Sequence, residues 1–449
     1  MKSKRVRAIL ATVGVALTLG VSAALGGCTA TAGRDGVNGK DLNIYEVYAA
    51  AKAETNNPDL TFSDFLKEYF SYTPAEISLQ TALNRSLLSA VSVQSQFREY
   101  ESGIWKSNAY SGSGVIIDVD TEKGDMTVVT NCHVVYSAKA NRLAQDGFSD
   151  NIHLWLYGSE SDYENTYKQN AIPAKLVAAS KTYDVAVLKV TGSDIVKNSY
   201  ARAAEWSQAE EVYLGETVYA IGNANSQKLS ANVGCISKDS ELIKVDLGDN
   251  NDGYQYTVMR TSAAINSGNS GGGLFNIGCE IVGLVNAKGK SDATGFGYAL
   301  TAASTRRVVE SMLDNYADTG AEAHYLNRVK HGITVEVADM YSTGLNASGY
   351  TEIVEKVKIS GINLGSAASG KLKSDDVLKH IKITGMRKNE DGVEELFEVE
   401  NMEINREHNF HDAMLSVRAG DMVEITVIRG ADEVTQSMMF GSTAFEKVV

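Results

Sequence analysis

The chain has 449 residues but only three prolines, so no proline-rich linker separates its domains. Basic residues form no block beyond the N-terminus, and the formal net charge of −14 at pH 7 argues against a nucleic-acid-binding protein. The four cysteines and seven histidines show no zinc-site spacing, and nothing implies a metal or an organic cofactor. Hydrophobic residues at 43% and charged residues at 22% predict instead a folded, soluble protein, whose length suits two or three domains.

The N-terminus resembles an export signal. Four basic residues stand within the first seven, an apolar stretch runs from Ala8 to Leu25, and Leu25-Gly26-Gly27-Cys28 resembles a bacterial lipobox. We therefore predict a signal peptide over residues 1–27, a lipid on Cys28, and a lipoprotein anchored to the outer face of the bacterial cytoplasmic membrane. The alternative is an uncleaved membrane helix, which the threonines and serine within the stretch disfavour. Residues 28–84 are predicted as a stalk and a short helical segment.

Three cysteines remain once Cys28 is lipidated: Cys132, Cys235 and Cys279. An exported protein can hold a disulfide, and Cys235 and Cys279 lie on apolar runs that could be neighbours in one barrel. Equally, all three could be reduced and buried, where they would behave as small apolar residues. The sequence leaves both alternatives open.

The segment Gly268-Asn269-Ser270-Gly271-Gly272 is the most informative of the chain. A serine between glycines lets the backbone turn sharply, so that consecutive N–H groups point into one concavity that can stabilise an oxyanion. By itself such a cluster is typical of an ordinary turn. Further evidence is therefore needed before it indicates catalysis.

Two other segments supply that evidence. Thr130-Asn131-Cys132-His133-Val134-Val135 follows an apolar run, and Asp184 is a lone acid at the start of another. Histidine, aspartate and serine thus occur in the order of the chymotrypsin-type triad. The steps between them are 184 − 133 = 51 and 270 − 184 = 86 residues, which leaves room for most of a small β-barrel within each step.

Short strands are predicted at intervals of roughly ten residues, which is typical of an all-β sandwich or barrel. Eleven or twelve strands suit two six-stranded antiparallel barrels, with His133 and Asp184 in the first barrel and Ser270 in the second. The predicted strands are Gly114–Asp118, Met126–Thr130, Ile152–Leu156, Ala174–Ala178, Val185–Val190, Thr217–Ile221, Gly234–Ser237, Tyr256–Thr261, Gly273–Phe275, Ile281–Val285 and Gly297–Leu300.

A third region follows a helix predicted to start at Ser304, whose side chain can cap the first turn. We assign residues 306–329 to this linker helix. Beyond it, four strands and a short amphipathic helix indicate an α+β domain over residues 330–449. These elements are Gly332–Val335, Glu352–Val357, Val377–Ile383, Met422–Ile428 and the helix Phe410–Val417.

The motifs over residues 85–305 resemble the HtrA (Deg) family of trypsin-like serine proteases. The three segments around His133, Asp184 and Ser270 match that family in order, as do Ser113–Ile117 and Ile281–Leu284. The resemblance implies a serine endopeptidase with two β-barrels. Three departures are Ser262, Ser267 and Gly273, which stand where the family has aspartate, proline and proline.

The resemblance also implies the roles of individual residues. His133 is expected as general base, Asp184 as the residue that orients it, and Ser270 as nucleophile, with an oxyanion hole at Gly268, Asn269 and Ser270. No acid is expected on the floor of the substrate pocket, so small or medium apolar side chains should fit it. The expected pocket residues are Ala264, Asn286, Ala287, Lys288, Gly297 and Tyr298.

Residues from about 330 to 442 are similar to a PDZ domain, on the matches Gly365–Leu372, Asp376–Leu378 and Ala419–Gly430. Thr384–Arg406 is an acidic insertion in that pattern. The resemblance implies that peptide C-termini bind near Lys330–Ile333. Expected partners are polypeptide substrates, such peptide C-termini and, through the lipid, the membrane; a homo-oligomer stays open.

A competing hypothesis is a non-catalytic surface protein of the same fold that holds peptides as a chaperone or scaffold. Degenerate proteases normally lose one of the three triad residues, whereas this chain retains all three. We therefore favour an active protease that acts in protein quality control on unfolded or extended polypeptides.

Overall fold

We describe the protein from a computed structural model. The described residues are 78–140, 146–159, 170–245, 247, 253–288, 295–319, 325–346, 349–388 and 392–448. The predicted signal peptide, the lipidation site Cys28, and the stalk up to residue 77 lie outside them.

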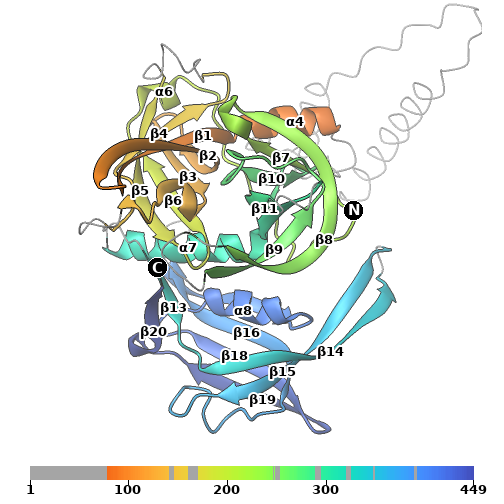
Figure 1. Ribbon diagram of the computed structural model, residues 1–449. Helices are drawn as coiled ribbons and strands as arrows, with labels where there is room; N and C mark the ends of the chain where they lie inside the picture. The colour runs from red at the N-terminus through yellow and green to blue at the C-terminus, as the bar shows by residue number, and fades with distance from the viewer. Residues whose placement is uncertain are drawn as a thin grey trace, which may run out of the picture. The chain divides into compact units, whose positions relative to one another are not determined.

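The first barrel closes in the strand order β1-β2-β3-β6-β5-β4 (Figure 1). Its central strands β3 and β6 are almost wholly buried and rich in β-branched residues, which suits strands that are covered on both faces. Closure leaves no free sheet edge. The strands are β1 Ala90–Glu101, β2 Ile104–Asp120, β3 Asp125–Thr130, β4 Asn151–Leu156, β5 Ile172–Ser180 and β6 Val185–Val190.

The second barrel closes in the order β10-β11-β12-β9-β8-β7. It repeats the all-antiparallel pairing of the first barrel. Its strands are β7 Thr217–Gly222, β8 Ser230–Val245, β9 Tyr254–Thr261, β10 Gly273–Asn276, β11 Ile281–Lys288 and β12 Gly297–Thr301.

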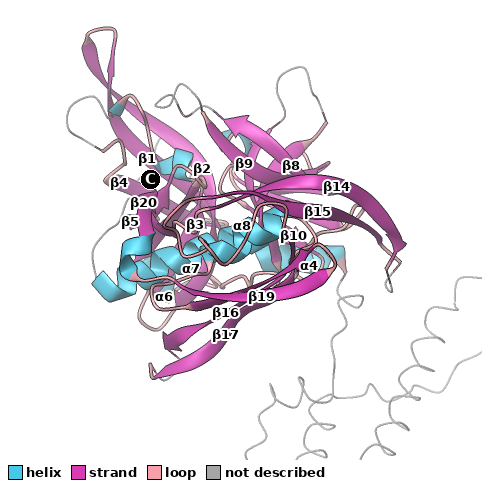
Figure 2. Ribbon diagram, turned by 90° about the horizontal axis from the view of Figure 1, so that it is seen from below, coloured by secondary structure: helices cyan, strands magenta, loops and turns pink. Residues whose placement is uncertain are grey.

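Few helices accompany the strands (Figure 2). Ser78 caps the first of them, because its hydroxyl accepts a hydrogen bond from the N–H of Thr81. The long helix α7 begins at Ala302, two residues before the predicted start, and the Thr301 hydroxyl accepts from the Ser304 N–H at 3.3 Å. The helices are α4 Leu79–Leu87, α5 Cys132–Val135, α6 Asp194–Lys197, α7 Ala302–Thr319 and α8 Glu407–Leu415, with 3₁₀ turns at Ala224–Ser226 and Ser442–Ala444.

The C-terminal domain has a six-stranded sheet in the order β14-β15-β16-β18-β19, with β17 paired to β16, and a two-stranded sheet β13-β20. Phe410, Ala413 and Met414 of α8 are buried in the core of this domain. The strands are β13 Leu326–Val329, β14 Ile333–Leu345, β15 Thr351–Ile362, β16 Val377–Lys388, β17 Glu394–Glu403, β18 Met422–Arg429, β19 Asp432–Met439 and β20 Phe445–Val448.

The largest hydrophobic cluster crosses these sequence divisions. It contains Val187 of the first barrel, Phe275 of the second and Val308 of α7. It also contains Leu326 of β13 and Leu415 of α8, which belong to the C-terminal region. Apolar burial therefore contributes to joining the C-terminal domain to the rest of the chain.

The structure confirms the predicted fold class, which is mostly β with two closed six-stranded antiparallel barrels. It also shows what the sequence patterns did not predict. The acidic insertion Thr384–Arg406 contains a regular strand, β17, paired along β16. The helix predicted at Phe410–Val417 instead runs from Glu407 to Leu415.

Candidate active site

His133 and Asp184 meet where two strands of the first barrel end. β3 ends at Thr130, Asn131 stands before α5, and His133 is the second residue of that short helix. The Nδ1 atom of His133 lies 2.8 Å from Oδ2 of Asp184, and the main-chain N–H of His133 donates to Oδ1 at 2.9 Å. One carboxylate therefore orients both the ring and the backbone of the histidine.

Asp184 occupies a turn between β5 and β6 in an unusual backbone conformation. Its φ of +51° lies in the left-handed region, which aspartate tolerates better than most residues but which is still strained. The Asn131 side chain holds this turn by donating from Nδ2 to the main-chain oxygen of Asp184 at 2.9 Å. The side chain of Asp184 is fully buried.

Asn286 links this pair to the loop that carries Ser270. Its side-chain Nδ2 donates to Oδ2 of Asp184 at 2.5 Å, while its main-chain oxygen accepts from the Ser270 hydroxyl at 2.9 Å. We expected Asn286 in the substrate pocket, and the sequence did not predict its contact with Asp184. The side chain is 2% exposed, and its amide is directed to the carboxylate.

The electrostatics of His133 reflect opposing effects. Burial disfavours the charged imidazolium, but the charge of Asp184 and its hydrogen bond outweigh that cost, and the pKa of His133 is raised above 6.5. A carboxylate that favours the protonated ring is the electrostatic requirement for a histidine that accepts a proton during a reaction.

Glycines permit the tight path of the loop that carries Ser270. Gly268 has φ of +93°, and a Cβ there would lie 2.2 Å from the main-chain oxygen of Asn223. Gly271 has φ of +83°, and a Cβ there would lie 2.2 Å from Oγ1 of Thr130. Both positions therefore exclude any side chain.

Ser113 of β2 fastens that loop to the first barrel, a contact that sequence reasoning missed. Its N–H donates to the oxygen of Ser270 at 2.8 Å, and its hydroxyl donates to the oxygen of Gly268 at 2.7 Å. The same hydroxyl accepts from the N–H of Asn223 at 2.8 Å. The buried Ser113 of β2 therefore connects the loop that carries Gly268 and Ser270 with the segment that begins at Asn223.

The turn leaves two main-chain donors available. Among the described residues, the N–H groups of Gly268 and Ser270 have no acceptor, whereas the N–H of Asn269 donates to Asn266. Two free N–H groups one residue apart are the arrangement required of an oxyanion hole.

Ser270 and His133 are not hydrogen-bonded to each other in this structure. The Ser270 hydroxyl donates to Asn286 instead. Hydrogen bonds between catalytic groups often tighten only when substrate binds. The geometry therefore shows the histidine–aspartate pair assembled and the serine hydroxyl held by a neighbouring carbonyl.

The residues expected around the substrate pocket lie on neighbouring strands. Ala287 and Lys288 of β11 pair with Tyr298 and Gly297 of β12. Ala264 is exposed in the loop before Ser270.

Ile265, which we did not predict as a pocket residue, packs so closely on Gly297 that a Cβ at position 297 would lie 2.1 Å from its side chain. The Tyr298 hydroxyl donates to Oε1 of Glu241 at 3.4 Å.

The predicted disulfide alternative is wrong, because Cys132, Cys235 and Cys279 are all unbonded. Cys235 on β8 lies beside Ser262, whose hydroxyl accepts from the Cys235 N–H at 2.9 Å. Cys279 lies in the turn after β10, with its sulfur 3.8 Å from the oxygen of Ala82. The two side chains thus have different neighbours. The other alternative expected all three cysteines to be reduced and buried. Of the three, Cys132 is buried, whereas Cys235 and Cys279 are half-buried.

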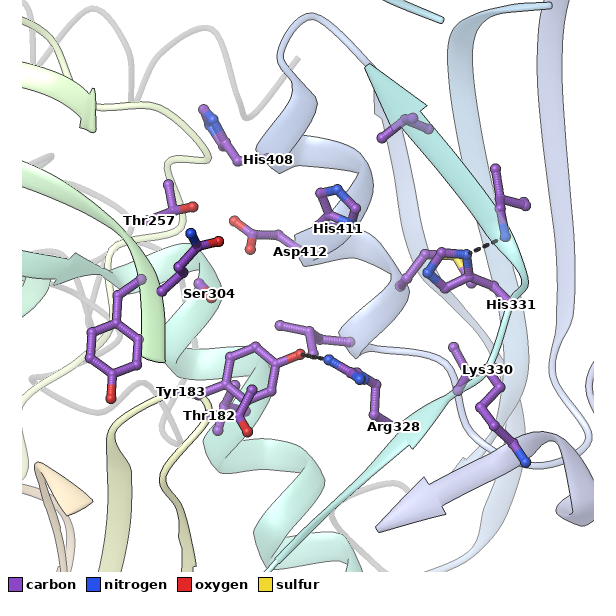
Figure 3. A pocket seen from close by; sticks show the side chains of 18 of the residues that line it. Thr182, Tyr183, Thr257, Ser304, Arg328, Lys330, His331, His408, His411 and Asp412 are labelled. Atoms are coloured by element: carbon purple, nitrogen blue, oxygen red, sulfur yellow. Dashed lines mark hydrogen bonds between the residues drawn. The ribbon is translucent and has the colours of Figure 1, made fainter. Parts of the chain in front are cut away.

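A separate cavity of about 790 Å³ is lined by residues of the barrels and α7 on one side and of β14 and α8 on the other (Figure 3). Tyr183, Ser304 and Thr257 of the catalytic region line it, together with residues of the C-terminal domain, which include Arg328, Lys330, His331, His408, His411 and Asp412. Burial lowers the pKa of His331 to about 4, with help from the neighbouring His411 and Arg328. Within the part of the chain that the structure describes, no cluster of three His, Cys, Asp or Glu side chains is arranged to hold a metal ion.

Comparisons with known proteins agree with this geometry. The family model described as a trypsin-like peptidase domain matches residues 112–284. The protein named "Serine protease Do-like HtrA" of Bacillus subtilis (strain 168) is 26% identical over 384 residues, which cover 84% of this chain and 72% of that protein. The chain is a serine endopeptidase with a trypsin-like peptidase domain.

Other relatives share smaller parts of the chain. "Serine protease Do-like HtrB" of the same organism is 32% identical over 206 residues, which cover 45% of this chain and 38% of that protein. The solved structure "HtrA-type protease AlgW with tripeptide" is 21% identical in sequence and has a TM-score of 0.48. The match covers 82% of this chain and 97% of the chain in that structure.

Proposed function

We propose that this chain is a membrane-anchored, extracytoplasmic endopeptidase that cleaves unfolded or extended polypeptides with His133, Asp184 and Ser270 as its triad. The observation that supports this most directly is the contact of His133 Nδ1 with Asp184 Oδ2 at 2.8 Å, beside a serine loop with two free N–H groups.

The chemistry would proceed in the order that the contacts allow. The Ser270 hydroxyl leaves the Asn286 carbonyl, gives its proton to Nε2 of His133 and attacks the scissile carbonyl. The N–H groups of Gly268 and Ser270 take the oxyanion, each worth roughly 2.7–4 kcal/mol in the transition state. His133 then protonates the leaving amine, and a water molecule hydrolyses the acyl-enzyme in the same way.

The substrate would be an extended polypeptide that pairs with the enzyme as an added strand. The Asn286 main-chain oxygen, which holds Ser270 in this structure, is a ready acceptor for a substrate N–H. The close packing of the apolar Ile265 side chain on Gly297 supports small or medium apolar side chains at the cleavage site.

The remaining assignments rest on the sequence patterns. The lipobox-like segment supports a lipid on Cys28 and a location at the outer face of the cytoplasmic membrane. The described residues contain no helix long and apolar enough to cross a membrane. The PDZ-like pattern supports binding of peptide C-termini in the cavity beside Lys330 and Gly332, where main-chain N–H groups would take the carboxylate.

The decisive experiment compares residues 29–449 with a Ser270→Ala copy on unfolded casein. We expect the wild-type chain to cleave casein with a rate that rises through the pKa of His133, and the variant to lose about 10⁶-fold in kcat. Cleavage by Ser270→Ala at the wild-type rate would refute the triad. If both chains bind casein and neither cleaves it, the chaperone or scaffold hypothesis replaces ours. A Cys28→Ser chain that stays in the membrane fraction as firmly as wild type contradicts the lipid anchor.

A further inference from the structure

The turn that carries Asp184 contacts the C-terminal domain through Tyr183, the preceding residue. Tyr183 packs against the hydrophobic cluster that includes Leu326 and Leu415 of that domain. Its hydroxyl accepts a hydrogen bond from Nη1 of Arg328 at 3.4 Å, and Figure 3 shows the two side chains meeting at one end of the cavity.

Arg328 is itself held in place by its own domain. It lies on β13, which pairs with β20, and its Nη2 atom donates to Oε1 of Glu446 on β20 at 2.6 Å. The ion pair with Glu446 orients the planar guanidinium of Arg328, whose other terminal nitrogen reaches the Tyr183 hydroxyl. The hydrogen bond between Arg328 and Tyr183 therefore forms only when the C-terminal domain is packed against the barrels.

A buried ionic bridge holds the C-terminal domain against the catalytic region. Arg307 of α7 is 1% exposed and donates to Glu210 of the catalytic region at 2.8 Å and to Glu400 of β17 at 2.7 Å. Glu400 belongs to the acidic insertion, and the Ser416 hydroxyl also donates to it. A buried cation with two carboxylates from different regions leaves uncompensated charge if one partner is removed.

Further polar contacts join the same two regions. Arg406 donates to Asp239 of β8 at 2.7 Å, and Asn409 donates to Glu211 at 2.9 Å. The Nε2 atom of His408 also lies 3.4 Å from Oε1 of Glu211. The interface is thus specified by charges as well as by apolar burial.

Asp184 needs such support because its backbone is strained. A residue at φ of +51° keeps that conformation only when its surroundings hold it. On its own side, the turn is held by the Asn131 amide and by the Tyr256 hydroxyl, which donates to the oxygen of Lys181 at 2.8 Å. Through Tyr183 the turn has a further contact, with Arg328, which lies outside the two barrels.

We propose that the C-terminal domain, held by the Arg307 bridge, positions the acid of the catalytic pair through Arg328 and Tyr183. This inference rests on the proposed triad. Tyr183 and Arg328 are positioning residues, because they touch neither the substrate nor the reacting atoms. Loss of their contact loosens the turn, and Asp184 then orients His133 less well.

The test uses Tyr183→Phe, which keeps the ring, and Arg328→Met, which keeps the length of the side chain. On a small peptide substrate we expect kcat to fall roughly two- to tenfold, the factor that one hydrogen bond is worth, with KM unchanged. Asp184 raises the pKa of His133. If Asp184 is positioned less well, it raises that pKa less, so we expect the acid limb of the pH profile to move to lower pH. Arg328→Lys should restore part of the loss.

Matched controls are Tyr200→Phe and Arg85→Met, both at exposed positions. The pKa of His133 is also followed by NMR in Ser270→Ala chains with and without Tyr183→Phe, which decides the question even if the wild type cleaves nothing. A wild type without activity overturns the proposed function alone. An unchanged His133 pKa and unchanged kcat in Tyr183→Phe and Arg328→Met overturn this inference alone.

The bridge is tested with Arg307→Ala or, if that chain does not fold, Glu400→Gln. We expect a larger radius of gyration in solution scattering and the same lowered acid limb as in Arg328→Met. A chain whose domains separate while kcat and the acid limb stay at wild-type values contradicts the proposal.

Discussion

Asp184 of the proposed triad and Asp412, which lines the large cavity, are both buried aspartates near a histidine. Asp184 accepts three N–H groups, two from His133 and one from Asn286. Asp412 faces Ser304, His408, Arg307 and the like-charged Glu210, and burial raises its pKa to about 6.

The comparison shows what a buried carboxylate requires. Hydrogen-bond donors that point at the carboxylate oxygens replace the water molecules that the carboxylate loses on burial. Because these donors are already in position, they need not move when a proton is transferred. Asp184 has these donors on both oxygens. Asp412 has only partial compensation, so its burial favours the neutral form. We therefore expect substitutions at the two sites to affect different properties, activity at one and stability at the other.

The largest effect should follow Asp184→Asn. The amide cannot hold the imidazolium of His133, and the expected loss in kcat is about 10⁴-fold. The measurement is kcat on a peptide substrate, with circular dichroism to check folding. Asp194→Asn, at an exposed position, is the matched control. A loss below tenfold in a folded chain contradicts the role that we assign to Asp184.

Asn286→Ala should have the next largest effect, because it removes one of the three donors to Asp184. A hydrogen bond to a charged group is worth about 1.5–3 kcal/mol, so kcat should fall roughly 10–100-fold. Asn286→Ser keeps a donor and should lose less. If Ala and Ser lose equally, the amide of Asn286 does not act through Asp184.

Asp412→Asn should change stability rather than activity. The folded chain holds a proton at Asp412 up to about pH 6, whereas the unfolded chain loses it near 3.8, so stability falls as the pH rises between these values. Asparagine avoids that loss, and the variant should be more stable by up to about 3 kcal/mol above pH 6.

Thermal unfolding at pH 4 and pH 8 measures the effect of Asp412→Asn. The gain should be present at pH 8 and nearly absent at pH 4, with kcat close to wild type. An equal gain at both pH values would show that the cause is packing and not the charge of Asp412.

The sequence alone was sufficient for the barrels and for the neighbourhood of the triad. Short runs of buried residues, many of them β-branched, recur at regular intervals along the chain, and β3, β6 and β11 contain such runs. The glycines beside Ser270 indicate a tight turn, because glycine adopts the positive φ of Gly268 and Gly271 more readily than other residues do, and this backbone preference is local. Local patterns of this kind can be read without knowing which strands become neighbours.

Only the tertiary structure decided the contacts that hold the site. Asn286 reaches Asp184 across 102 residues of chain, and Ser113 reaches Gly268 across 155. The unbonded cysteines and the bridge from Arg307 to Glu210 and Glu400 are likewise products of packing. Such pairs carry no local signature, because their geometry exists only after both barrels have closed and the C-terminal domain has packed against them.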